Sequence, residues 1–122
     1  MTRPACIRPV LLALIAAALL VTATASVSAQ LGARTASEWV ATLETPARIA
    51  SLKIDEVVAR LRLRSGQVVA DIGAGSGLFE GALAAAVGPT GMVYAEDIDF
   101  ELLTHIGDRA ATLKLNNVET VL

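Results

Sequence analysis

The chain opens with a basic, then an apolar, then a small-residue block. Arg3 and Arg8 precede the uninterrupted apolar run Val10–Val21, and small, weakly polar residues follow as far as Ala29. That order is typical of a secretory signal peptide. The run of 12 residues is shorter than the roughly 20 that span a bilayer as a helix. We therefore predict a signal peptide over residues 1–29, cleaved after Ala29 for export to the periplasm or the medium. An uncleaved membrane anchor is the alternative.

Residues 30–66 show a helical pattern and form the predicted N-terminal helical segment. Thr35 and Glu38 have the spacing of a capping box, which begins a short helix. A second helix is expected to begin at Pro46, since proline suits the first helical position. Its apolar face has the spacing i, i+3, i+4, i+7 and comprises Ile54, Val57, Val58 and Leu61. Gly66 is expected to end it.

Beyond residue 66 the pattern alternates between short apolar runs and longer helical ones. The expected elements are a strand at Val68–Ile72, a helix at Leu78–Val87, a strand at Met92–Glu96, a helix over about 100–113 capped by Asp99, and a strand at Val118–Leu122. This alternation predicts an α/β domain with a parallel sheet. The β-branched first strand suits burial on both faces. A finished sheet of this kind normally has several more strands, so we expect residues 67–122 to be the first half of a truncated domain.

Charge and composition narrow the class of partner. The 122 residues carry 10 Lys and Arg against 12 Asp and Glu, a net charge of −2. Loss of Arg3 and Arg8 with the signal peptide makes it −4. The sequence shows no basic patch of the kind that nucleic acid demands. Cys6 lies inside the predicted signal peptide, and His105 has no partner Cys or His nearby in sequence, so we predict neither a disulfide nor a metal site.

The glycine-rich stretch from Asp71 to Gly77 is the most informative motif. It follows a predicted strand and opens a predicted helix, where glycine permits sharp turns and close approach of a ligand to the backbone. A dinucleotide fingerprint that starts at Gly73 would place its third glycine at position 78, which is Leu78. Asp97 follows the second strand, 24 residues after Gly73. A carboxylate there can accept hydrogen bonds from the ribose hydroxyls of an adenosine.

Residues Val68–Gly77 and Val93–Ile98 resemble the first and second motifs of class I S-adenosylmethionine-dependent methyltransferases, and the similarity extends over about residues 54–122. The resemblance implies a Rossmann-like parallel sheet, here incomplete and preceded by N-terminal helices, and S-adenosylmethionine as the cofactor. The implied cofactor-binding residues are Asp71, Gly73, Ala74, Gly75, Gly77, Asp97 and Ile98. In the family the first-motif acid and glycines line the methionine and adenosyl groups. Asp97 would bind ribose and Ile98 would pack against adenine. Glu96 stands where an apolar residue is commoner, which leaves open which of the two acids faces the ribose.

The predicted function is methyl transfer to an unidentified acceptor. The resemblance favours a small-molecule acceptor, and contact with a membrane only through an uncleaved N-terminal segment. No catalytic residue is identified. One alternative is a truncated, non-catalytic remnant or nucleotide-binding module. Another is an NAD(P)-dependent oxidoreductase, against which Leu78 argues. Export also conflicts with a cofactor that is made in the cytoplasm.

Overall fold

The computed structural model describes residues 34–122. The predicted signal peptide, its cleavage after Ala29 and Cys6 lie outside the described residues. Thr35–Leu122 forms one compact unit. Among residues 34–122, no helix has both the length and the apolar character that crossing a membrane requires.

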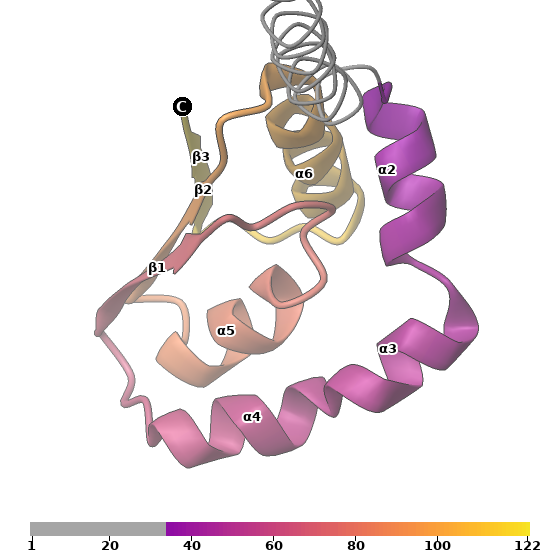
Figure 1. The fold of residues 1–122 in the computed structure, drawn as a ribbon. Helices are drawn as coiled ribbons and strands as arrows, with labels where there is room; N and C mark the ends of the chain where they lie inside the picture. The colour runs from indigo at the N-terminus through magenta and orange to yellow at the C-terminus, as the bar shows by residue number, and fades with distance from the viewer. Residues whose placement is uncertain (1–33) are drawn as a thin grey trace, which may run out of the picture. The chain divides into compact units, whose positions relative to one another are not determined.

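Three helices precede the sheet and form an arc around α5 (Figure 1): α2 (Ala36–Leu43), α3 (Pro46–Leu52) and α4 (Ile54–Leu61). The predicted capping box of α2 is confirmed. The backbone N–H of Glu38 donates to Thr35 Oγ1 at 3.4 Å, and the N–H of Thr35 donates to Glu38 Oε2 at 2.8 Å. These bonds satisfy donors that the first turn of a helix otherwise leaves without partners.

The single helix expected from Pro46 onward is divided in two. Lys53 adopts a left-handed conformation (φ 47°), and Arg62 (φ 51°) ends α4 in the same way. The division allows Leu52 of α3 to face the glycine loop, while Val58 of α4 packs into the cluster beneath α5. Packing against two different surfaces therefore overrides the local preference for one continuous helix.

The sheet is parallel, as predicted, with strand order β1-β2-β3. The strands are β1 (Val68–Ile72), β2 (Met92–Glu96) and β3 (Val118–Val121), joined by α5 (Glu80–Val87) and α6 (Phe100–Thr112). The register pairs Ile72 with Glu96, so the carboxyl ends of β1 and β2 lie side by side. The prediction of an α/β fold with a Rossmann-like parallel sheet is confirmed.

The core lies between the sheet and the helices α5 and α6. Val93 and Ala95 of β2 are fully buried, as are Val87 of α5 and Ile106 of α6. The expectation that β1 is buried on both faces is wrong for the described residues. Its residues alternate in exposure, with Val68 67% and Ile72 71% exposed, because α5 covers the face toward which Val69 projects and no described helix covers the other.

Candidate functional site

The glycine loop is held against the carboxyl end of β2. The backbone N–H groups of Gly73 and Ala74 both donate to the carbonyl oxygen of Glu96, at 2.8 and 3.0 Å. Asp71, the penultimate residue of β1, and Asp97, directly after β2, therefore stand at one edge of the sheet. Ligands of parallel α/β folds bind at this edge.

The three glycines of the loop, Gly73, Gly75 and Gly77, all adopt positive φ (77°, 60° and 76°), but their surroundings differ. A Cβ on Gly77 would lie 2.9 Å from Cγ1 of Ile106, so this glycine lets α6 approach closely. A Cβ on Gly75 would lie 3.1 Å from Cδ1 of Leu43, the last residue of α2. A Cβ on Gly73 would meet nothing within 4 Å, which leaves the backbone of Gly73 open to a ligand.

Of the two acids at the end of β2, only Asp97 accepts a hydrogen bond from the loop through its side chain. Its Oδ2 accepts a hydrogen bond from the N–H of Gly75 at 2.9 Å, and its Oδ1 accepts one from the N–H of Asp99 at 3.0 Å. The Glu96 side chain is exposed, and Ile98, the residue after Asp97, is 98% exposed. The side chains of Asp97 and Ile98 thus stand at the rim of the loop, where each retains surface for a ligand.

A hollow of about 140 Å³ lies between the loop and the N-terminal helices. Asp71 and Gly73 line one part of it, and the half-buried side chain of Arg48 from α3 lines another. Among residues 34–122, the guanidinium of Arg48 has no hydrogen-bond or ion-pair partner. Sequence reasoning missed Arg48, because only the fold brings α3 beside the loop.

A second residue that the sequence did not single out is Glu80, at the start of α5. It is only 3% exposed, and no donor among the described residues reaches either of its carboxyl oxygens. The carboxyl group of Asp71 is its hydrogen-bonding neighbour, so the pair is satisfied only when one of the two carries a proton. In the sequence, the only sign of this buried acid is that Glu80 is the single charged residue within the apolar run 78–87.

Burial changes the acidity of both carboxyl groups. Burial raises the pKa of Glu80 to about 7. The backbone N–H of Glu80, near its own carboxyl group but without hydrogen-bond geometry, opposes the rise. The charge of Asp71 and its hydrogen bond with Glu80 add to the rise, and the positive charge of Arg109 opposes it. Burial also raises the pKa of Asp71, with the charge of Asp97 adding and the hydrogen bond from Glu80 opposing. With a pKa of about 7, Glu80 keeps a proton below neutral pH.

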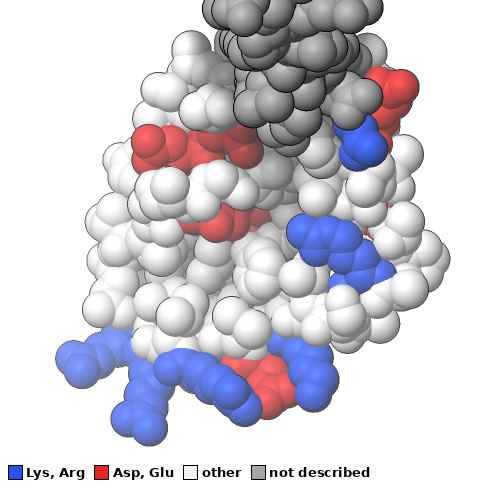
Figure 2. All heavy atoms as spheres, viewed as in Figure 1, with Lys and Arg blue, Asp and Glu red and all other residues white. Residues whose placement is uncertain are grey.

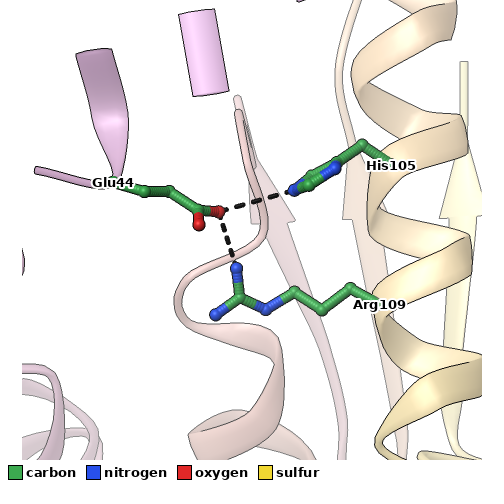
Figure 3. A network of polar contacts seen from close by, with 3 residues as sticks. All are labelled: Glu44, His105 and Arg109. Carbon is green, nitrogen blue, oxygen red and sulfur yellow. Dashed lines mark hydrogen bonds and ion pairs between the residues drawn. The ribbon is translucent and has the colours of Figure 1, made fainter. Parts of the chain in front are cut away.

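Arg109 also fastens α2 to α6 (Figure 3). Its Nη1 donates to Oε1 of Glu44 at 2.6 Å, and Nε2 of His105 lies 3.4 Å from the same oxygen. This partly buried cluster fixes the end of α2, whose last residue, Leu43, packs against Gly75. His105 thus has a structural partner. Among residues 34–122, no group of three or more His, Cys, Asp or Glu side chains is placed to hold a metal ion.

On the face shown in Figure 2, most acidic side chains lie toward the end at which the strands finish, and most basic ones follow the opposite edge, over α4. Further basic side chains lie on the right of this view, and one acidic group lies within the basic edge. The ligand edge of the sheet is therefore the acidic end of the face shown in Figure 2.

No protein-family model matches this sequence, and no curated protein matches it. Solved structures do. A SAM-dependent methyltransferase from Aquifex aeolicus is 30% identical with a TM-score of 0.64, over 72% of this chain and 46% of that one. A coclaurine N-methyltransferase bound to N-methylheliamine and SAH is 23% identical (TM-score 0.55; 65% of this chain, 23% of that one). A putative rRNA methylase from Clostridium thermocellum is 23% identical (TM-score 0.51; 59% and 38%).

This chain spans less than half the length of each of these three proteins. All three are named as methyltransferases or methylases, and two of the names include S-adenosylmethionine or SAH. The acceptors named differ from one protein to the next. The comparisons therefore support the fold and S-adenosylmethionine as its cofactor, and they do not determine the acceptor.

Proposed function

We propose that this chain, whose described residues have the fold of class I S-adenosylmethionine-dependent methyltransferases, binds S-adenosylmethionine and supplies the cofactor-binding part of a methyltransferase. The observation that carries the proposal is the convergence of Asp71, the glycine loop and Asp97 at the carboxyl ends of β1 and β2. The glycine spacing also argues against a dinucleotide ligand, because Leu78 stands where the third glycine would be.

The side chains fit the two ends of this cofactor. Asp71 and Arg48 line the same hollow but form no ion pair with each other, so they leave opposite charges for the ammonium and carboxylate groups of an amino acid. At about 140 Å³ the hollow is smaller than the roughly 300 Å³ or more of a complete small-molecule pocket. It therefore suits the methionine end only. We assign Asp97 and Ile98, at the rim, to the ribose and the adenine.

The bound cofactor supplies a sulfonium-activated methyl group for in-line attack by an acceptor. The residues of this chain bind and orient it: the loop backbone approaches at Gly73, and Asp71 and Arg48 hold the amino-acid end. We assign no general base to the described residues. We propose a small-molecule acceptor rather than nucleic acid, since the acidic end of the face shown (Figure 2) would repel phosphates.

The test is calorimetric titration of the full chain with S-adenosylmethionine. Asp97→Asn removes a charged acceptor and should weaken binding by about tenfold or more, the equivalent of roughly 1.5–3 kcal/mol for a charged hydrogen bond. The matched control is Glu96→Gln, the exposed acid next to it, which should bind as the wild type does. Tighter binding of NAD⁺ than of S-adenosylmethionine would favour the oxidoreductase alternative, and equal losses in the two variants would contradict the role of Asp97.

We further propose that residues 1–29 direct export or anchor the chain to a membrane. Intact mass of the endogenous protein in separated cell fractions tests this. A mass below 12.6 kDa by one signal peptide, in the exported fraction, supports cleavage. The unprocessed mass in the membrane fraction supports the anchor, and recovery in the cytosol contradicts both.

A further inference from the structure

Glu80 is the one feature of the site that cofactor binding by itself leaves unexplained. Its carboxyl group is buried beneath the glycine loop without a donor among the described residues, next to the acid expected to face the ligand. An ionised carboxylate buried without a hydrogen bond is costly, so such a group is retained at a stability penalty. We propose that Glu80 and Asp71 share a proton and that binding of the cofactor expels it, which makes Glu80 a positioning residue for Asp71. This inference rests on the proposed function.

The surroundings of Glu80 keep its carboxyl group where it is. Its Oε2 lies 3.2 Å from the place that a Cβ on Gly77 would occupy, beside Ile106 of α6. The side chain therefore points into the packed region between β1 and α6 and not to solvent. Ile106 therefore limits how far the carboxyl group of Glu80 can turn away from this position.

The charged groups around the pair come from four elements. Asp71 belongs to β1, and Asp97, which follows β2, adds negative charge to Asp71. Arg109 of α6 acts on Glu80 but is already hydrogen-bonded to Glu44, which His105 also approaches. Arg48 of α3 lines the hollow on the ligand side. Among residues 34–122, no cation forms an ion pair with either of these two carboxyl groups. Because the pKa of Glu80 is about 7, the pair holds one proton below neutral pH.

A ligand ammonium group placed opposite Asp71 supplies the missing positive charge. It favours the doubly ionised pair, as a nearby opposite charge does for any carboxyl group. The balance is simple. The O–H bond of Glu80 breaks, the proton passes to the buffer, and an N⁺–H···O⁻ hydrogen bond forms between the ligand and Asp71. Affinity must then rise as pH rises through the pKa of Glu80.

The experiment is calorimetric titration of the full chain with S-adenosylhomocysteine, which carries the ammonium group but no sulfonium charge. The titrations are run at pH 6, 7 and 8 in buffers of different ionisation enthalpy. The dependence of the observed binding enthalpy on the buffer gives the number of protons released. Linkage predicts release of roughly half a proton at pH 7 and a Kd about tenfold lower at pH 8 than at pH 6. Glu80→Gln should abolish both effects, because its amide donates to Asp71 without titrating. The control Glu101→Gln, an exposed acid on α6, should keep both.

Each outcome decides the matter. Binding to the wild type without proton release overturns this inference and leaves the proposed function intact. Failure of S-adenosylhomocysteine and S-adenosylmethionine to bind at any pH overturns both. If Glu80→Gln does not fold, ¹³C NMR of the glutamate carboxyl groups in the wild-type chain replaces it. A Glu80 signal that titrates near pH 7, and at lower pH once the ligand is bound, supports the inference. A signal that titrates below pH 5 without ligand overturns it.

Discussion

At the scale of single residues, Glu80 connects the stability of the fold to pH. Its pKa is about 7 in the folded chain against 4.5 for the free side chain. A raised folded-state pKa contributes stability that is fully present below about pH 4.5 and is lost as pH rises through about 7. The loss is about 3 kcal/mol at most, at 1.36 kcal/mol for each pKa unit. We expect the free energy of unfolding, measured with urea, to fall between pH 5 and pH 8.

Other groups titrate in the same range, so the comparison with Glu80→Gln isolates this contribution. The variant should lack most of the fall that the wild type shows between pH 5 and pH 8, since its amide does not ionise. Wild type and variant curves that run parallel over this range would show that Glu80 ionises normally in the folded chain.

Gly77 is the loop position where a side chain is least tolerable. A methyl group there would combine a left-handed backbone (φ 76°) with an approach of 2.9 Å to Cγ1 of Ile106, which is fully buried. Gly77→Ala should lower the free energy of unfolding by about 2–4 kcal/mol. The matched control is Gly107→Ala in α6, where a Cβ meets nothing within 4 Å and alanine should stabilise the helix by about 0.5–1 kcal/mol. Similar urea midpoints for the two variants would contradict the packing argument.

At the scale of elements, the end of α5 is fixed from across the fold. The Nδ2 group of Asn117 donates to the carbonyl oxygens of Ala84 and Gly88, at 3.0 and 2.9 Å. Each of these carbonyls also accepts a backbone N–H, from Gly88 and Gly91 respectively, so Asn117 adds a second hydrogen bond to each at the end of the helix. Asn117→Ala should therefore cost about 1–3 kcal/mol, measured by thermal or urea unfolding. Asn116→Ala, at an exposed neighbouring position, should change the free energy of unfolding little, and an equal cost in both variants would argue against capping by Asn117.

Sequence predicted the elements well where the signal was local. The capping box of Thr35, the N-cap of Asp99 and the apolar runs of the strands each depend on residues within one turn or one strand, and each is confirmed. The break at Lys53 was missed, because no glycine or proline marks it and packing against separate surfaces produces it. The candidate site shows the same contrast between local signals and contacts made by the fold. The loop glycines are visible in sequence, whereas Arg48 and Glu80 acquire meaning only from neighbours that the fold supplies.

At the scale of the whole molecule, β1 is one of the two edge strands of the described sheet, the other being β3. Within residues 34–122 it pairs only with β2, and the side chains of Val68 and Ile72 are largely exposed. A free, apolar strand edge is a template for pairing with another chain. We expect the chain to self-associate through β1 in a concentration-dependent way, and sedimentation velocity across a dilution series should show larger species that dissociate on dilution.

Substitution at β1 distinguishes this edge from other apolar surface. Val68→Lys places a charge on the open face and should shift the distribution toward monomer, because a lysine on a strand edge opposes pairing with an incoming strand. Val57→Lys is the matched control, since Val57 is also a partly exposed valine but lies on α4, away from the sheet. The wild type and both lysine variants carry the same apolar N-terminal run, so any association that this run causes is equal in all three and does not affect the comparison. If both lysine variants associate as the wild type does, β1 is not the contact; if only Val68→Lys becomes monomeric, the edge of β1 is where this sheet accepts its next strand.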